Sequence, residues 1–416
     1  MRLQDIGFYT LSDERARTAS GASPMTRGEI IILSNCNFKC PYCRGLRGDC
    51  AGTMSLAKVK EVLSLWAKDG LRNVRFSGGE PTLHPNIKEI IAFSRSLGVK
   101  RIAISTNGSA PLSLYQELIS LGVNDLSVSL DACCSSVGKR MCGGVEGAWE
   151  KVVSNIRELA KLTYVTVGMV LTADNADIVR ESVLFAHSLG VADIRVIPSA
   201  QGGKALGGLG DLPKEVLDAH PILAYRVRNM LEGVSVRGLG EGDWNRCPLV
   251  MDDSAVSGNW HFPCIIYLRE KGNPIGRIGP TMREERVKWA REHDCLADPI
   301  CRGNCLDACI AYNAKFAELQ MEFDLPEMDA TQFDWLSWRG GGFSEWENIV
   351  SDEGKAKIRK YAIGWCRGES LTCRPKPDEF AVMFLKGEEQ RWFHMRKREF
   401  YEVFGRIRGT NGSGRQ

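Results

Sequence analysis

Short apolar runs alternate with longer amphipathic stretches through the first half of the chain. The apolar runs are rich in β-branched residues and lie at residues 30–33, 73–76, 101–105, 125–130, 163–171 and 193–197. Stretches with a helical period separate them, at residues 55–70, 84–98, 113–122, 146–161 and 176–190. This alternation predicts an α/β fold, with a parallel sheet covered by helices, as an open sheet or a partial barrel.

Glycine closes several of the helical stretches, at Gly70, Gly98, Gly122 and Gly190. Glycine readily takes the left-handed conformation that follows the last turn of a helix. We therefore expect helices to end at these positions.

The alternating pattern stops after residue 198. A glycine-rich stretch follows at residues 199–212 and is typical of a loop that could close over a site. Farther on, two strands flanking Gly387 and a helix after them are predicted in an aromatic-rich segment. We expect four parts: an N-terminal extension at 1–28, a core at 29–212, a cysteine-rich region at 240–312 and a small α+β C-terminal extension at 320–416.

Composition narrows the class of protein. The 416 residues are 44% hydrophobic and 25% charged, as in soluble globular proteins, and the formal net charge is +3. This balance gives no indication of nucleic-acid binding. No apolar run approaches the roughly 18–20 residues of a membrane helix, and the N-terminus lacks a signal-peptide pattern. We expect a cytoplasmic protein in which the 15 cysteines do not form a disulfide framework, and their clustering indicates metal binding.

Polar and sulfur-containing residues follow four successive predicted strands. The sequences CNFKCPYC, SGGEP, STNGS and SLDACC come directly after the first, second, third and fourth strands. Because parallel strands present their carboxyl ends at one edge of the sheet, these residues are expected to share one site.

The first of these sequences contains Cys36, Cys40 and Cys43, spaced C-x3-C-x2-C. Thiolates on a short loop suit soft metals and iron-sulfur clusters. A structural zinc site needs four ligands, and only Cys50 lies close enough in sequence to be a fourth. A cubane cluster on three cysteines leaves one iron open, which is the interpretation we favour; zinc is the alternative.

The four sequences together resemble the radical S-adenosylmethionine (radical SAM) superfamily over roughly residues 28–200. The resemblance implies a partial (β/α)6 TIM-like barrel and a [4Fe-4S] cluster held by Cys36, Cys40 and Cys43, with SAM on the fourth iron. One electron, from a donor such as flavodoxin or ferredoxin, would split SAM into methionine and a 5′-deoxyadenosyl radical that abstracts hydrogen from a substrate.

The resemblance also implies which residues contact SAM. Glu80 matches the residue that holds the methionyl amine, Tyr42 the aromatic beside the adenine, and Arg195 a partner of the carboxylate. The full implied set is Tyr42, Ser77, Gly78, Gly79, Glu80, Ser105, Thr106, Asn107, Ser129, Asp131 and Arg195. Taken singly, a glycine pair is usually a turn and an S-L-D sequence a helix cap; their order on successive strands favours a site.

Six further cysteines follow the predicted barrel: Cys247, Cys264, Cys295, Cys301, Cys305 and Cys309. They resemble the SPASM or twitch extensions of radical SAM enzymes, and GNWHFPC resembles a hairpin that delivers Cys264. The match departs where Glu241 and Glu292 stand in place of cysteines. We expect one auxiliary [4Fe-4S] cluster, and a second only if His293, Cys309 or a distant thiol completes it; structural zinc is the alternative.

Cys133, Cys134 and Cys142 lie at the mouth of the predicted sheet. Some radical SAM epimerases quench the substrate radical with a thiol hydrogen, which makes Cys142 a candidate catalytic donor. The alternative is a small buried hydrophobe or an idle thiol, as for Cys50 and the pair Cys366 and Cys373.

Three functions are open at this level. Radical modification of a ribosomally made peptide is favoured weakly, and residues 1–28 are too short for a peptide-recognition domain. Radical rearrangement or oxidation of a small molecule or nucleotide is the second. A non-catalytic zinc or iron-sulfur protein is the third, and the intact cysteine loop and GGE sequence count against it. The expected partner is a peptide or small-molecule substrate.

Overall fold

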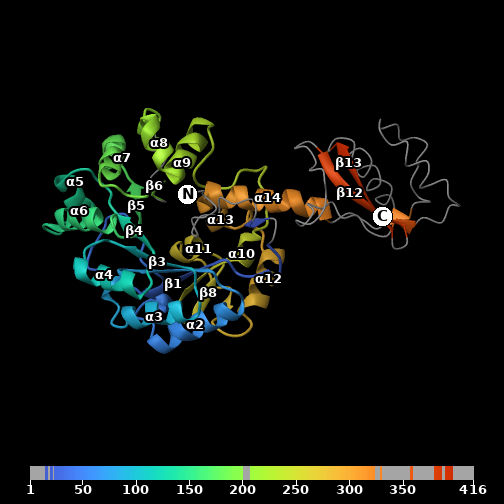
Figure 1. The fold of residues 1–416 in the computed structure, drawn as a ribbon, viewed down its shortest axis with the longest axis horizontal. Helices are drawn as coiled ribbons and strands as arrows, with labels where there is room; N and C mark the ends of the chain where they lie inside the picture. Colours follow the sequence, from blue (N-terminus) through green and yellow to red (C-terminus); the bar gives the residue numbers. More distant parts are fainter. Residues whose placement is uncertain are drawn as a thin grey trace. The chain divides into compact units, whose positions relative to one another are not determined.

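A computed structural model describes residues 15–16, 19–21, 23–199 and 207–323, with side chains up to Phe316. It also describes the backbone of four short strands between residues 328 and 396. The chain divides into two units, residues 1–316 and 317–416, which are treated separately below (Figure 1).

Six parallel strands form the centre of the first unit, in the order β6-β5-β4-β3-β2-β1. They are β1 (Arg27–Leu33), β2 (Asn73–Gly78), β3 (Arg101–Thr106), β4 (Asp125–Ser129), β5 (Tyr164–Leu171) and β6 (Asp193–Pro198). Each strand pairs in parallel with the next along the chain. All six predicted strands are confirmed. Among the described residues β6 has no second partner strand, so the sheet stays open, as expected for a partial barrel.

Helices connect these strands and pack on them (Figure 1). The five predicted ones are α2 (Leu56–Lys68), α3 (Ile87–Ser96), α4 (Leu112–Leu121), α6 (Ala148–Leu159) and α7 (Val179–Ser188). Three more, not predicted, are α5 (Ser135–Met141), α8 (Lys214–Ala219) and α9 (Pro221–Leu231). The glycines predicted to end helices all have positive φ, from +76° to +128°. Trp66 of α2 packs directly on Gly28 of β1, where any Cβ would overlap the indole.

The cysteine-rich region extends the same sheet beyond β1. β7 (Asp253–Ser257) pairs with β1 in parallel, and β8 (Trp260–Phe262) and β9 (Gly276–Arg277) continue it antiparallel. Five helices complete the region: α10 (Leu249–Asp252), α11 (Ile265–Arg269), α12 (Met282–Glu292), α13 (Pro299–Asn304) and α14 (Asp307–Phe323). The predicted hairpin before Cys264 is confirmed as β7 and β8. Its pairing with β1 was not predicted, and it makes the core and the cysteine-rich region one compact unit.

In the second unit, β12 (Glu379–Lys386) and β13 (Glu389–Arg396) form an antiparallel pair, as predicted for the strands around residue 387. A short antiparallel pair, β10 (Met328–Asp329) with β11 (Lys357–Ile358), precedes them. The helix predicted after β13, Cys366 and Cys373, and residues 200–206 of the glycine-rich stretch lie outside the described residues. None of the helices in the described part of the chain combines the length and the apolar character that crossing a membrane requires.

Candidate functional site

A cavity of about 350 Å³ lies at the carboxyl ends of the parallel strands. It is lined by most of the predicted site residues: Cys36, Cys40, Tyr42, Cys43, Ser77, Gly78, Gly79, Ser105, Thr106, Asn107, Ser129, Asp131 and Cys142. Residues from four strand ends therefore meet in one place, as the motif order predicts.

The loop that carries Cys36, Cys40 and Cys43 presents its thiols to this cavity. Cys36 and Cys43 are exposed and Cys40 is half-buried. Two N–H groups point at the sulfur of Cys36, from the backbone of Phe38 at 3.4 Å and from Asn107 Nδ2 at 3.8 Å. N–H donors of this kind tune cluster-bound thiolates, so the three residues and their surroundings fit an iron-sulfur cluster.

Two contacts fasten the loop to the sheet. The Tyr42 hydroxyl donates to Asp131 Oδ2 at 2.6 Å, and the backbone N–H of Lys39 donates to the carbonyl of Cys142 at 3.2 Å. Asp131 Oδ1 also accepts from the backbone N–H of Val170 at 2.7 Å. Burial raises the pKa of Asp131 to about 6, while the bonds from Tyr42 and Val170 lower it in part. Tyr42 and Asp131 line the cavity as a bonded pair.

The glycine pair of SGGEP serves close packing of the chain on itself. A Cβ on Gly78 would overlap the carbonyl of Leu33, and one on Gly79 would overlap that of Asn35. The space lets Gly79 N–H donate to Leu33 O, and Glu80 N–H to Asn35 O, both at 2.8 Å. The glycines hold the end of β2 against the start of the cysteine loop, and both also line the cavity.

Glu80 is fully buried and does not line the cavity. Its Oε1 accepts from the Thr82 backbone N–H at 3.0 Å and from the hydroxyls of Thr82 and Thr106 at 2.7 and 2.8 Å. Its Oε2 accepts from the Asn107 backbone N–H at 2.6 Å. Burial raises the pKa of this carboxyl and the bonds lower it in part. Through these hydrogen bonds Glu80 links its own motif, SGGEP, to the STNGS motif after β3. Its expected contact with the amine of SAM stays a prediction.

Arg195 also lies apart from the residues that line the cavity. It is on β6 beside Gly168 of β5, and its charge acts on Asp125 at the start of β4. The position of Arg195 therefore does not support the expected contact with the carboxylate of SAM.

Cys142 lines the cavity, and its thiol is 8% exposed. The Sγ contacts the carbonyls of Lys139 at 3.3 Å and Val145 at 3.7 Å. Cys133 and Cys134 are not among the lining residues. Of the three thiols considered at the mouth, Cys142 is the one beside the cavity, and its role as a hydrogen donor stays a prediction.

Three arginines on the cavity wall were missed by sequence reasoning: Arg44, Arg237 and Arg269. Arg44 pairs with Glu270, Arg269 donates to Gly78 O at 2.8 Å, and Arg237 donates to Pro198 O at 3.1 Å. Burial, and then the charge of Arg44, lowers the pKa of Arg237 to about 10. Arg44 adjoins Cys43 and could have been noticed, whereas Arg237 and Arg269 reach the cavity only through the tertiary fold.

Comparison with known proteins identifies one part of the chain. Residues 30–186 match the model of the Radical SAM superfamily. This part of the chain is a radical SAM domain. The match covers the four motifs that line the cavity and the strands that precede them, and it ends before β6.

Relatives and solved structures resemble parts of the chain. The probable GTP 3',8-cyclase of Sulfolobus acidocaldarius is 30% identical over 172 residues, which are 40% of this chain and 54% of that protein. The GTP 3',8-cyclase of Chlorobaculum tepidum is 32% identical over 106 residues, 24% of this chain and 32% of that protein. The chain thus spans about half the length, or less, of these relatives. Streptococcus suis SuiB bound to S-adenosylmethionine matches at a TM-score of 0.47 and 15% identity, covering 68% of this chain and 73% of that one.

The second cysteine group lies beyond the radical SAM domain, around a cavity of about 40 Å³. All six predicted cysteines line it: Cys247, Cys264, Cys295, Cys301, Cys305 and Cys309. The spacing in sequence is therefore matched by proximity in space, which fits metal binding.

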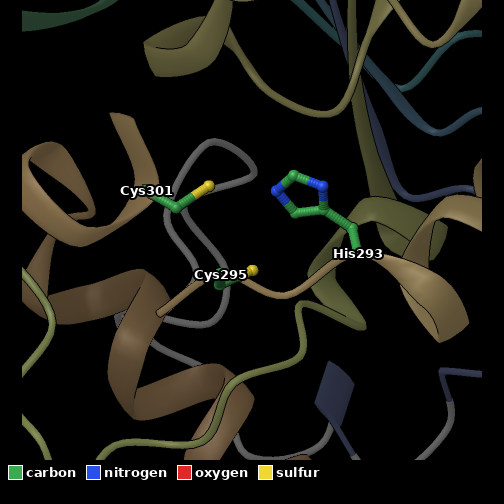
Figure 2. A group of neighbouring side chains, drawn as sticks. All are labelled: His293, Cys295 and Cys301. Carbon is green, nitrogen blue, oxygen red and sulfur yellow. The ribbon is translucent and has the colours of Figure 1, made fainter. Parts of the chain in front are cut away.

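Contacts link these six thiols into one group. A hydrogen bond with Cys295, together with burial, raises the pKa of Cys247 well above its usual range. A hydrogen bond between Cys305 and Cys309 raises the pKa of Cys305, and the charges of Cys247 and Cys264 add to this. Burial raises the pKa of Cys264 well above its usual range. On the other side, Cys295 and Cys301 lie with His293, and the ligand atoms of these three are all within 4.8 Å of one another (Figure 2).

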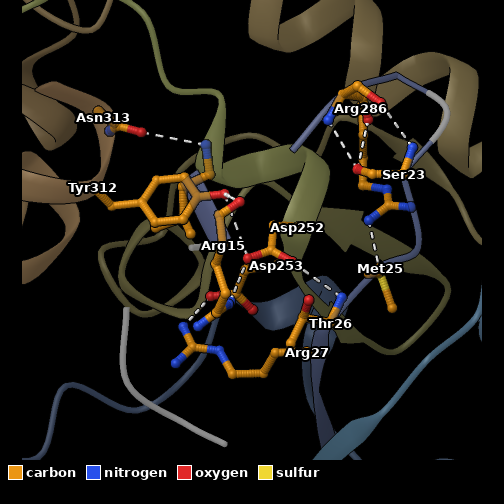
Figure 3. Close-up of polar contacts among 12 residues, drawn as sticks. Arg15, Ser23, Met25, Thr26, Arg27, Asp252, Asp253, Arg286, Tyr312 and Asn313 are labelled. Carbon is orange, nitrogen blue, oxygen red and sulfur yellow. Dashed lines mark hydrogen bonds and ion pairs between the residues drawn. The ribbon is translucent and has the colours of Figure 1, made fainter. Parts of the chain in front are cut away.

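Polar contacts attach the second cysteine region to the start of β1 (Figure 3). The backbone N–H of Thr26 donates to the carbonyl of Asp252 at 3.0 Å, and Arg15 pairs with Asp252 at 2.5 Å. Arg27, on β1 itself, pairs with Asp253 of β7. Because both carboxylates are buried, these pairs fix how β7 meets β1, and with it the position of the second cavity beside the radical SAM domain.

Proposed function

We propose that this protein is a radical SAM enzyme that acts on an anionic small molecule, with a nucleotide as the first candidate. One observation carries the proposal: three arginines line the same cavity as the three thiols of the cysteine loop, which belongs to the part of the chain that matches the Radical SAM superfamily. Thiols of this kind bind the cluster, and arginines bind carboxylate or phosphate.

The first part of the proposal concerns SAM. When bound at Cys36, Cys40 and Cys43, a [4Fe-4S] cluster supplies the electron for reductive SAM cleavage, after reduction by an external donor such as flavodoxin or ferredoxin. Ser105, Asn107 and Ser129 offer hydroxyl and amide groups on the same wall. They are proposed to hold the polar groups of SAM, while Tyr42, bonded to Asp131, keeps the loop in place.

The second part concerns the charge of the substrate. Among the lining residues three side chains are basic and one, Asp131, is acidic. Burial lowers the pKa of Arg44, Arg237 and Arg269, and neighbouring arginine charges lower the pKa of Arg44 and Arg237 further. An anion in the cavity relieves this repulsion. The SAM carboxylate is one such anion, and three guanidinium groups can serve a further phosphate or carboxylate.

The names of the relatives agree with an anionic substrate. Two of them are called GTP 3',8-cyclase or probable GTP 3',8-cyclase, and GTP carries phosphates. Peptide modification, the function first favoured from the sequence, stays a prediction that no described residue specifically supports. The auxiliary cluster is proposed on the second cysteine group.

The proposal is tested by anaerobic reconstitution with iron, sulfide, dithionite and SAM, followed by quantification of 5′-deoxyadenosine. We expect 5′-deoxyadenosine from the wild-type protein and none above background from a Cys36→Ser, Cys40→Ser, Cys43→Ser variant. Absence of 5′-deoxyadenosine from a cluster-loaded wild-type protein, with GTP and other nucleotides supplied, favours the non-catalytic alternative.

The Arg237→Gln variant tests whether Arg237 binds the carboxylate of SAM or an anionic group of the substrate. If Arg237 binds substrate, the variant keeps uncoupled SAM cleavage and loses about 10- to 100-fold of substrate-dependent turnover. If it binds SAM, the KM for SAM rises even without substrate. Arg157→Gln, at an exposed position on α6, is the matched control and is expected to change neither. An Arg237 variant equal to the control in both assays removes the support for an anionic substrate.

A further inference from the structure

We propose that His293, Cys295 and Cys301 bind a single Zn²⁺ ion, separate from the four cysteines that remain for an auxiliary cluster. The two sulfurs and an imidazole nitrogen lie within 4.8 Å of one another, with the ring edge of His293 turned toward the sulfur of Cys301 (Figure 2). Imidazole together with thiolate is a typical donor set for zinc.

The spacing favours one ion over a cluster. Bond lengths of about 2.0 Å to nitrogen and 2.3 Å to sulfur put the ligand atoms of a tetrahedral zinc site about 3.3–3.8 Å apart. A closure from 4.8 Å or less to that range is within reach of small side-chain rotations. In a cubane, each sulfur binds a different iron, and the ligand atoms lie farther apart than on one ion.

The imidazole of His293 is held in place by aromatic packing. The ring stacks on Trp289, with centroids 4.1 Å apart and an interplanar angle of 16°, and meets Tyr267 edge-on at 6.2 Å. Its Nε2 is buried, and the polar group beside it in the described part of the chain is the carboxylate of Asp298. An imidazole nitrogen fixed beside a carboxylate and two thiols is a geometry that suits a metal ion.

Asp298 supplies a fourth ligand or a supporting contact. Its Oδ2 lies 3.3 Å from His293 Nε2 and accepts from the Tyr267 hydroxyl at 2.8 Å. A separation of about 3.3 Å is what an oxygen and a nitrogen have on one tetrahedral zinc ion. The other oxygen, Oδ1, caps α13 by accepting from the backbone N–H groups of Ile300 and Cys301, at 2.8 and 3.0 Å. The cap therefore fixes Asp298 and Cys301 together.

The sequence around the site is consistent with one ion. Glu292 stands where the resembling extensions have a cysteine, so a four-cysteine set for a second cluster is incomplete among the described residues. The remaining thiols, Cys247, Cys264, Cys305 and Cys309, are four in number, as one auxiliary cluster requires, and Cys247 contacts Cys295 where the two groups meet. Zinc binding forms two Zn–S bonds and one Zn–N bond, and releases the thiol protons of Cys295 and Cys301 to solvent.

The test measures metal content in a protein that lacks the first cluster, so that its outcome does not depend on SAM cleavage. A Cys36→Ser, Cys40→Ser, Cys43→Ser background, reconstituted anaerobically with iron, sulfide and zinc, is expected to hold about four irons and one zinc per chain. Adding His293→Ala or Cys301→Ser should remove the zinc and leave the iron. Cys134→Ser, a thiol outside both groups, is the matched control and should change neither.

Two outcomes overturn the proposal. Loss of about four irons in the His293→Ala and Cys301→Ser proteins means that these residues bind an iron-sulfur cluster instead of zinc. Unchanged zinc and iron in both means that they bind no metal. Cobalt substitution of the unmutated site gives the same answer if a variant misfolds: tetrahedral Co²⁺ with thiolate ligands gives intense visible absorption and a charge-transfer band, and their absence counts against the site. If the proposed SAM cleavage fails, the zinc result stands on its own.

Discussion

The two cysteine groups of the first unit are built in opposite ways. Cys36, Cys40 and Cys43 come from eight consecutive residues on one loop, and two of them are exposed to the main cavity. The second group is gathered from residues 247–309, on the ends of five helices and the segments between them, around a cavity about one ninth as large. The first group presents its thiols to the main cavity, and the second encloses a small cavity of its own.

The two arrangements imply different roles for the metal that each group is proposed to bind. Thiols on an exposed loop join no distant segments, so a cluster there serves chemistry and adds little to stability. Thiols from α11, α13 and α14 join separate segments, so metal there stabilises the folded chain as a cross-link does. Four experiments test this contrast, from the largest expected effect to the smallest.

Removing the loop thiols should abolish chemistry and spare the fold. The Cys36→Ser, Cys40→Ser, Cys43→Ser protein is expected to lose about a thousandfold or more in 5′-deoxyadenosine formation, because no reductant reaches SAM without the cluster. Its melting temperature should move by less than about 2 °C. A large drop in melting temperature would remove the contrast between the two groups.

Removing two thiols of the second group should act mainly on stability. For Cys264→Ser with Cys305→Ser we expect loss of about four irons and a melting temperature lower by about 5–10 °C, equivalent to ~2–4 kcal/mol. Serine can still cap α11 as Cys264 does for the Tyr267 N–H, so the loss reports on metal rather than on the cap. Calorimetry with iron analysis measures both. An unchanged melting temperature with iron lost would show that the second group is not structural.

The glycine that supports the loop should matter nearly as much to the fold as the second group. Gly79→Ala puts a methyl group onto the carbonyl of Asn35 and is expected to destabilise the protein by about 2–4 kcal/mol in urea unfolding. Gly48→Ala, at a glycine with open space around it and no positive φ, is the control and should stay within about 0.5 kcal/mol of wild type. Equal effects would mean that the contact is relaxed easily.

The smallest expected effect is a pH dependence of stability that comes from Asp131, the hydrogen-bond partner of Tyr42 on the cysteine loop. The pKa of Asp131 is raised to about 6 by burial, so its contribution to stability is fully present below its unfolded pKa of about 3.9 and is lost as the pH rises through 6. Asp131→Asn should remove that slope from melting temperatures measured between pH 4 and 7. Tyr42→Phe removes a bond that lowers this pKa and should extend the slope to higher pH. Parallel curves for wild type and Asp131→Asn would contradict the assignment.

Much of the radical SAM domain was predictable because local signals agree with its tertiary arrangement. Each apolar run is a strand buried on both faces, and each glycine at a helix end has the positive φ that its identity suggested. The cavity residues came from motifs directly after strands, where parallel pairing brings them to one edge. Glu80 and Arg195 are not among the lining residues: Glu80 is buried and hydrogen-bonded to Thr82, Thr106 and Asn107, and Arg195 lies on β6 beside Gly168.

Long-range contacts were beyond sequence reasoning. β7 carries no signal that it pairs with β1, because strand pairing depends on which edge is free after the core has formed. The same pairing brings Arg269 to Gly78, 191 residues away. The grouping of His293 with Cys295 and Cys301 depends on the aromatic neighbours of the imidazole, and these come from α11 and α12.

The sequence by itself determined the order of strands and helices, the cysteine loop and the glycine pair beneath it, because hydrophobic period, helix-end chemistry and ligand spacing are local properties of the chain. Only the tertiary structure decided that the cysteine-rich region continues the sheet, that three arginines share the cavity with the thiols, and that six cysteines gather around the second cavity. Those outcomes depend on contacts between residues far apart in the chain. The burial and the electrostatic surroundings of each residue come from such neighbours, and no local sequence pattern predicts them.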